Sequence, residues 1–155
     1  MRAAKDDTQA AVRWLRANAA RYRIDPTRIA VGGGSAGAVT ALLVGAFSED
    51  VGGGGNPGFS SKVGGVVSIS GTLPAEFDDL FGAGDAPTLL FVGTVNDFDP
   101  NRVVAIAGRL DNAGVTTSAQ VLEGAGHVPV DDTYGPRIFR QSAWFLYWVL
   151  DLAHA

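Results

Sequence analysis

One stretch of the chain, residues 28–38, constrains the fold more than any other. Strand-forming residues give way to three glycines and a single serine, and a helix-forming segment follows. Its centre fits G-x-S-x-G, a pattern in which a strand turns sharply into a helix and lifts a serine hydroxyl above a sheet. Because this turn is strained, only small residues fit beside Ser35, which explains Gly33 and Gly37. The turn also aims the Ala36 N–H at the oxygen of any carbonyl that the serine attacks.

The same glycines permit a second interpretation, a dinucleotide-binding turn. Residues 32–37 also fit G-x-G-x-x-G between a strand and a helix. That site needs an acidic residue at the end of the next strand, about 20 residues further on, to hold a ribose. The next strand-forming run, residues 66–70, is followed by Gly71, and Glu49 and Asp50 come too early, in a loop. The pattern therefore favours serine chemistry without a cofactor, and a glycine-rich turn with an incidental serine is the remaining alternative.

The composition limits the class of protein and its partners. The length of 155 residues suits one domain, residues 1–155. A content of 46% hydrophobic and 18% charged residues is ordinary for a globular protein. A net charge of -4 argues against nucleic acid or an anionic membrane as the partner. The absence of cysteine excludes disulfides, thiolate metal sites and a cysteine nucleophile, and nothing else implies a metal. No apolar run reaches membrane-spanning length and residues 1–7 lack a signal-peptide core, which predicts a cytoplasmic protein.

Hydrophobic periodicity predicts helices and strands in alternation. The first helix is expected from Asp6 to about Tyr22. Its core side is expected to be Ala11, Trp14, Leu15, Asn18 and Tyr22, and its solvated side Arg13, Arg16, Arg21 and Arg23. Strands are predicted at residues 28–31, 62–70, 88–93 and 116–123. Further helices are predicted at residues 36–47, from Pro100 to a stop at Gly114, and at residues 136–152, with a flexible surface loop at 48–58 and a long connection at 71–87.

Such alternation predicts an α/β fold, with about four parallel strands and helices on both faces of the sheet. Active sites of such sheets lie at the carboxyl ends of the strands. Three polar groups fall there: Ser35 after the first strand, residues 96–99 after the third, and His127 after the fourth. Nucleophile, acid and base in this chain order are what serine acyl transfer requires.

These motifs resemble those of an α/β-hydrolase, specifically a bacterial carboxylesterase of the feruloyl-esterase or hormone-sensitive-lipase-like kind. The resemblance extends over nearly the whole chain and rests on Asp25–Gly37 (DPTRIAVGGGSAG), Gly55–Val63 (GNPGFSSKV), Pro87–Thr94 (PTLLFVGT) and Leu122–His127 (LEGAGH). It implies a minimal hydrolase core in which Ser35 is the nucleophile and His127 the base. It also implies that an acidic residue after Gly93 orients the histidine.

We assign the acid to Asp97. Related esterases read Gly-Thr-x-Asp, with a proline four residues after the aspartate, and here Asn96 holds that spacing to Pro100. Asp97 is one residue late but lies nearest the strand end, so it is expected to orient His127. Asp99 directly precedes Pro100 and is expected to cap a helix. A solvated Asp97 beside a two-residue Ser–His site is the alternative.

The resemblance also implies that parts of the parent architecture are missing. The first strands and the His-Gly-Gly loop, which supplies the second oxyanion donor, are not in this sequence, and the 71–87 connection is too short for a cap domain. We therefore expect a slow serine esterase for small soluble esters, since one lost donor lowers kcat by about 10²- to 10³-fold. The alternative is a nearly inactive hydrolase core that acts as an interaction module.

The missing strands are expected to leave two surfaces bare. The strand at residues 28–31 would be an open sheet edge, and edges of this kind are normally paired or covered. Residues 144–150 are all large and apolar, and tryptophan and tyrosine are favoured at interfaces. We therefore expect a homodimer in which a second copy covers both surfaces and contributes backbone near Ser35.

Overall fold

A computed structural model of the chain describes residues 1–47, 55–95 and 98–154. Its centre is a sheet of four parallel strands in the order β1-β2-β3-β4. The strands are β1 (Val31–Gly34), β2 (Val66–Ile69), β3 (Thr88–Gly93) and β4 (Thr117–Leu122). Each strand pairs with the strand that follows it in the sequence. The predicted α/β fold is therefore confirmed.

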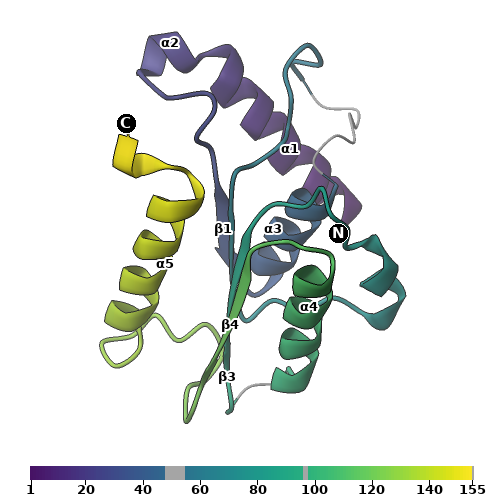
Figure 1. Cartoon of the computed structure of the whole chain (residues 1–155), viewed down its shortest axis with the longest axis vertical. Coiled ribbons are helices and arrows are strands. Elements are labelled where there is room, and N and C mark those ends of the chain that lie inside the picture. Colours follow the sequence, from purple (N-terminus) through teal and green to yellow (C-terminus); the bar gives the residue numbers. More distant parts are fainter. Residues whose placement is uncertain (48–54, 96–97, 155) are drawn as a thin grey trace.

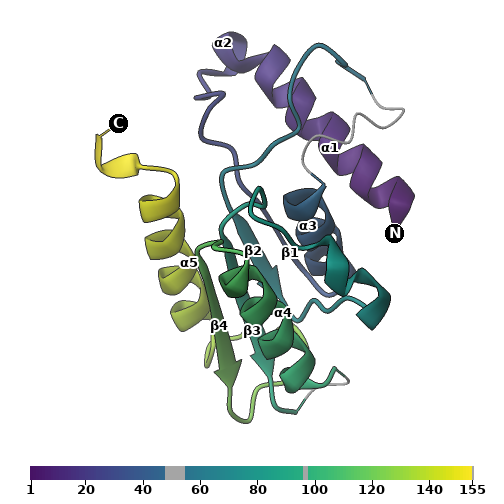
Figure 2. The same cartoon turned by 45° about the vertical axis from the view of Figure 1, so that its right-hand side comes forward.

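Helices cover both faces of this sheet. The helical elements are α1 (Arg2–Ala17), α2 (Ala19–Tyr22), α3 (Ala36–Ala46), α4 (Pro100–Asn112), α5 (Gly135–Val149) and the 3-10 turns η1 (Ala75–Leu80) and η2 (Leu152–His154). α3 and α4 lie on one face with α1 packed on α3, and α5 lies on the other (Figures 1 and 2). Because the crossovers through α3 and α4 run in the same direction across the sheet, right-handed connections place both helices on the same side. Within the described ranges, no helix has both the length and the apolar character that crossing a membrane requires.

The core is divided by β3, whose six residues are all buried. Leu90 and Val92 pack in the cluster under α3 and α4, whereas Leu89 and Phe91 pack in the cluster under α5. This alternation follows the two-residue period of a strand. The strand predicted at residues 88–93 is confirmed, and it is buried on both faces of the sheet.

The first strand begins later than predicted. It runs over Val31–Gly34 instead of residues 28–31, so the glycines of the serine motif are themselves strand residues. Upstream, the chain turns at residues 25–28, where the Asp25 carboxylate accepts hydrogen bonds from the Thr27 hydroxyl at 2.6 Å and the Thr27 N–H at 2.9 Å. These two hydrogen bonds lower the pKa of Asp25. Pairing with β2 overrides the weak strand propensity of glycine, because strand preference depends strongly on context.

Other predicted boundaries also shift. α1 starts at Arg2 instead of Asp6, and the strand predicted at 62–70 is shorter and comprises only β2. The connection predicted at 71–87 contains η1. The helix predicted at 136–152 is α5, which begins one residue earlier and ends at Val149. Residues 62–65 run beneath the end of α5 before the strand ladder begins. Gly64 passes so close to Leu150 that a Cβ on the glycine would lie 2.6 Å from Leu150 Cδ2. Part of the loop predicted at 48–58, residues 48–54, lies outside the described residues.

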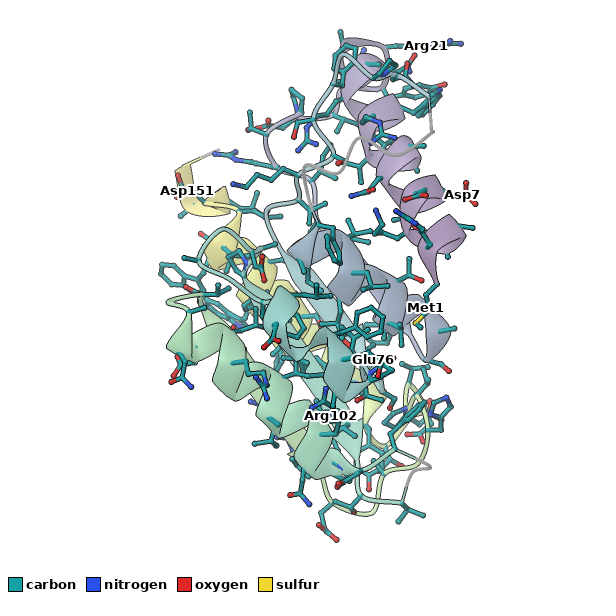
Figure 3. The ribbon with its side chains drawn as sticks, turned by 90° about the vertical axis from the view of Figure 1, so that its right-hand side faces the viewer. Met1, Asp7, Arg21, Glu76, Arg102 and Asp151 are labelled. Carbon is teal, nitrogen blue, oxygen red and sulfur yellow. The ribbon has the colours of Figure 1, made fainter. Side chains whose placement is uncertain are left out.

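The buried side of α1 is not the predicted one. Its buried residues are Lys5, Gln9, Val12 and Arg13, whereas Trp14 is 43% exposed. Gln9 Nε2 donates to the Phe47 carbonyl at the end of α3, and Arg13 Nε donates to the Gly55 carbonyl at 3.0 Å. The last carbonyls of a helix lack partners within that helix, and Gln9 supplies a donor to one of them, whereas Arg13 supplies a donor to a carbonyl in a loop. The prediction that Arg13 is solvated is therefore wrong, whereas Arg21 and Asp7 do point outward (Figure 3).

Two apolar surfaces are exposed, and they lie on different sides of α5. A groove of about 270 Å³ runs between β1, which is a sheet edge, and the Phe139 and Leu146 side of α5. Arg137 and Gln141 donate to Gln120 of β4, so the opposite side of α5 faces β4. Helical spacing places Trp144 and Trp148, 58% and 67% exposed, on this β4 side. The homodimer stays a prediction, and one interface would have to wrap around α5 to cover both surfaces.

Candidate active site

Ser35 lies at the junction of β1 and α3, at the carboxyl edge of the sheet. Its φ of 55° and ψ of -122° are unusual for a residue with a side chain. The Ser35 N–H donates to the Ile69 carbonyl at 2.9 Å, so pairing with β2 extends to the serine itself. Backbone strain of this kind costs about 1–3 kcal/mol and is concentrated at functional sites. The observed strain makes Ser35 a candidate for the chemistry.

The two glycines of the motif differ in how tightly they are enclosed. A Cβ on Gly33 would lie 2.5 Å from the carbonyl carbon of Gly37 and 2.7 Å from its oxygen. Since both atoms belong to backbone at the start of α3, no rotamer change relieves this overlap. A Cβ on Gly37 would meet no atom within 4 Å. Space alone therefore requires glycine at position 33, where the strand and the helix come together.

We predict that Gly33→Ala destabilises the protein by about 3 kcal/mol or more, because the overlap is with backbone. Gly37→Ala is the matched control: it adds the same methyl group in open space within a helix, and should be neutral or stabilising by about 0.5 kcal/mol. Urea denaturation measures both values. Equal stability of the two variants would contradict the described junction of β1 and α3.

Ala36 is the first residue of α3. The Ser35 carbonyl accepts hydrogen bonds from the N–H groups of Ala38 and Val39 at 3.0 and 3.1 Å, so bonding within the helix begins beyond Ala36. The first N–H groups of a helix have no acceptor inside it and lie at the positive end of its dipole. The Ala36 N–H is therefore in a position that suits a negatively charged oxygen beside Ser35.

His127 reaches Ser35 from the far edge of the sheet. It follows β4, and its Nε2 lies 2.8 Å from Ser35 Oγ, although 92 positions separate the two residues in sequence. The Phe98 ring packs beside the imidazole, with the ring centroids 5.3 Å apart and the planes tilted by 49°. An unprotonated Nε2 at this distance can accept the proton of the serine hydroxyl. The structure thus brings together two of the three side chains that the sequence singled out.

The loop that carries the histidine, residues 123–130, is fastened to the end of β3. The Gly124 N–H donates to Thr94 Oγ1 at 2.9 Å, and the Val95 N–H donates to the Ala125 carbonyl at 2.9 Å. We call this segment the histidine loop. The part of the loop that precedes His127 is held by hydrogen bonds to the two residues that follow β3. The position of the histidine therefore does not depend on the loop alone.

Comparison with known proteins identifies the family. The family model described as BD-FAE matches residues 1–107, more than half of the chain. The chain belongs to the BD-FAE family. Carboxylesterase NlhH of Mycobacterium tuberculosis is 48% identical over 48 residues, which are 31% of this chain and 15% of the carboxylesterase. The predicted membership of an α/β-hydrolase esterase group is confirmed.

Solved structures share the fold of this BD-FAE chain. A truncated carbohydrate esterase from gut microbiota superposes with a TM-score of 0.82 at 22% identity, over 95% of this chain and 68% of that one. Esterase 2 of the planctomycete Thermogutta terrifontis gives a TM-score of 0.81 at 21% identity, over 92% and 62% of the two chains. The BD-FAE chain thus spans about two thirds of these structures.

Of the two acidic residues considered for the site, the structure describes Asp99 and not Asp97. Asp97, assigned as the acid, lies outside the described residues, so its role stays a prediction. Asp99 caps α4 as expected: its carboxylate accepts a hydrogen bond from the Asn101 N–H at 2.9 Å, and Pro100 follows at the first helical position. The helix cap is therefore confirmed in this BD-FAE chain.

A matched pair of substitutions separates these two acids. If Asp97 orients His127 as predicted, Asp97→Ala should lower kcat by about 100-fold or more, because the imidazole would lose its correct tautomer and orientation. Asp99→Ala should leave kcat within about threefold and reduce stability by about 1 kcal/mol through loss of the cap. Ester turnover and thermal melting measure the two effects. The reverse pattern would transfer the orienting role to Asp99.

The dinucleotide alternative gains no support from the BD-FAE structure. β2 ends at Ile69 and is followed by Ser70 and Gly71, so no carboxylate stands at its end to hold a ribose. In the described ranges, no three acidic or histidine side chains gather closely enough to hold a metal ion.

Sequence reasoning gave no role to Ser70 and Val128. Both adopt positive φ, 55° and 49°, and the Val128 N–H donates to Ser70 Oγ at 3.3 Å. The sequence offers no signal for this contact, because 58 positions separate the two residues.

Proposed function

We propose that the chain is a serine carboxylesterase that hydrolyses small soluble carboxylic esters through an acyl-enzyme on Ser35. The observation that carries the proposal is the 2.8 Å contact between Ser35 Oγ and His127 Nε2 at the carboxyl edge of a parallel sheet. A strained serine at a helix start, next to a histidine nitrogen, is the arrangement that activates a hydroxyl for attack on a carbonyl. The family assignment and the names of the similar proteins support the same chemistry.

The chemical steps follow from the positions of these groups. Ser35 Oγ bonds to the ester carbonyl carbon while its proton passes to His127 Nε2. The carbonyl oxygen becomes negatively charged and accepts a hydrogen bond from the Ala36 N–H. His127 then gives its proton to the alcohol oxygen as the carbon–oxygen bond breaks. Water attacks the remaining acyl group, and the same histidine takes the proton of the water and returns it to Ser35 as the acid leaves.

Two further parts of the proposal concern rate and substrate. Asp97 is proposed to hold the imidazole in the tautomer that leaves Nε2 unprotonated. The Ala36 N–H is proposed as one donor to the oxyanion, and each such donor contributes about 10²- to 10³-fold to kcat. Small acyl groups are proposed because esterase 2 of Thermogutta terrifontis, which shares the fold, has been solved with propionate and with butyrate.

One observation favours a second candidate, a non-catalytic hydrolase core that binds another protein. Trp144 and Trp148 are more than half exposed. Exposed aromatic side chains are common at protein interfaces. This candidate predicts no ester turnover above that of buffer.

Hydrolysis of a chromogenic acetate ester, followed together with labelling by a fluorophosphonate, tests the two candidates. The esterase proposal predicts turnover and one phosphonate adduct on the tryptic peptide that contains Ser35. A protein that is folded by circular dichroism but shows neither turnover nor an adduct would favour the interaction module.

A further inference from the structure

The histidine loop must cross the sheet to reach the serine. His127 follows β4 and Ser35 follows β1, so β2 and β3 lie between them. Parallel strands are about 4.8 Å apart, and three such spacings make about 14 Å. A surface loop of this reach samples many conformations unless it is tied down along the way. Contacts between the loop and the strand ends beneath it therefore determine the fraction of time that His127 Nε2 lies within hydrogen-bond distance of Ser35 Oγ.

The first half of the crossing is fixed over β3, and the second half passes over β2. The hydrogen bonds of Thr94 and Val95 hold residues Gly124 and Ala125, before the histidine. After the histidine, the next contact is with Ser70, whose Oγ accepts the Val128 N–H at 3.3 Å. Val128 directly follows His127 in the loop.

Ser70 is a rigid anchor. It is fully buried, and its own N–H donates to the Phe91 carbonyl of β3 at 2.8 Å. Its φ of 55° is a conformation that residues with side chains rarely adopt, and it occurs directly after β2. A buried residue held in this way gives its hydroxyl a fixed position at the carboxyl edge of the sheet.

Val128 is held from a second direction by β1. Its φ of 49° is unfavourable for a β-branched residue, so surrounding contacts must impose it. Its side chain packs on Gly34, where an added Cβ would lie 2.7 Å from Val128 Cγ1. The backbone of Val128 is thus set between the end of β1 and the Ser70 hydroxyl, and this sets the direction in which the His127 side chain leaves the loop.

We propose that Ser70 is a positioning residue: its hydroxyl holds the backbone of Val128 and thereby keeps His127 Nε2 within hydrogen-bond distance of Ser35 Oγ. The proposal rests on the esterase function proposed above. In this proposal Ser70 influences the reaction through its contact with the histidine loop. Its loss should lower the rate of the chemical step and leave substrate binding unchanged.

The test compares Ser70→Ala with Ser68→Ala. Ser68 is also fully buried, two residues earlier in the chain and within β2, and its hydroxyl has no hydrogen-bond partner among the residues that the structure describes. Ser70→Ala should lower kcat and the rate of fluorophosphonate labelling about tenfold, with KM within about twofold. Ser68→Ala should leave all three within about twofold. Equal labelling rates in the two variants would overturn the proposal.

A second variant and a second measurement keep the result interpretable. Ser70→Gly removes the hydroxyl but accepts positive φ, so it should fold even where Ser70→Ala does not, and its labelling should slow equally. Hydrogen exchange of the Val128 amide, followed by NMR, should be about tenfold faster in both Ser70 variants than in Ser68→Ala. This measurement does not depend on activity. Unchanged exchange of the Val128 amide in the Ser70 variants would overturn the role of Ser70. Faster exchange in these variants, together with a wild-type protein that shows no ester turnover, would overturn the esterase function alone.

Discussion

Ser35→Ala should abolish ester turnover and leave the sheet intact. We expect kcat to fall by about 10⁴-fold or more, because the variant has no oxygen with which to form the acyl-enzyme. The side chain is small and lies at the edge of the sheet, outside both clusters of the apolar core. Turnover of a chromogenic acetate ester and labelling by a fluorophosphonate measure the loss, and circular dichroism checks the fold.

Ser35→Gly is the control that separates chemistry from backbone strain. It should be as inactive as Ser35→Ala, yet it should melt at a higher temperature, because glycine accepts a φ of 55° without the penalty that a Cβ carries. Two inactive variants whose stabilities differ in this direction would link the strain to the position of the nucleophile. Phosphonate labelling that persists at full strength in Ser35→Ala would contradict the assignment.

His127→Ala should reduce turnover as severely, by about 10⁴-fold. Without the imidazole, the Ser35 proton has no acceptor at 2.8 Å and the leaving alcohol has no donor. Because both side chains serve one chemical step, the double variant Ser35→Ala/His127→Ala should be no slower than either single variant. Steady-state kinetics of the three variants with one ester measures this.

The pH profile gives an independent check on the histidine. A general base must be unprotonated to accept a proton. Wild-type kcat should therefore rise with pH as the base loses its proton, and the residual activity of His127→Ala should lose that rise. Additive losses in the double variant, or the same rise in His127→Ala, would show that another group acts as the base.

Much of the fold follows from local pattern, and the exceptions have identifiable physical causes. The apolar run at 88–93 could be placed without a structure, since burial on both faces makes a strand continuously hydrophobic. β1 could not, because its glycines have little strand preference of their own and adopt the strand only by pairing with β2. The buried face of α1 also could not be predicted from the sequence. Arg13 points inward because a carbonyl at Gly55 needs a donor, and that carbonyl is 42 positions away.

The candidate site shows the same division between local and long-range information. G-x-S-x-G and a histidine after the last strand are local signals, and topology brings such strand ends to one edge. The Asp99 cap was likewise local, since Pro100 follows it directly. Ser70 carried no such signal: its positive φ and its contact with Val128 exist only once β2 lies beside the histidine loop. Asp97 lies outside the described residues, and its role rests on sequence alone.

The serial order of the strands also governs when reactivity arises during synthesis. Each strand pairs with the strand that is synthesised just before it. The sheet can therefore form one strand at a time as the chain leaves the ribosome. A nascent chain that ends after β4 would hold all four strands and a strained serine, but no histidine. The serine would stay inert until the following segment emerged and crossed back over the finished sheet. Covalent labelling of Ser35 would therefore report that the histidine loop has reached the serine, and nascent chains that end before His127 would not react with the same reagent.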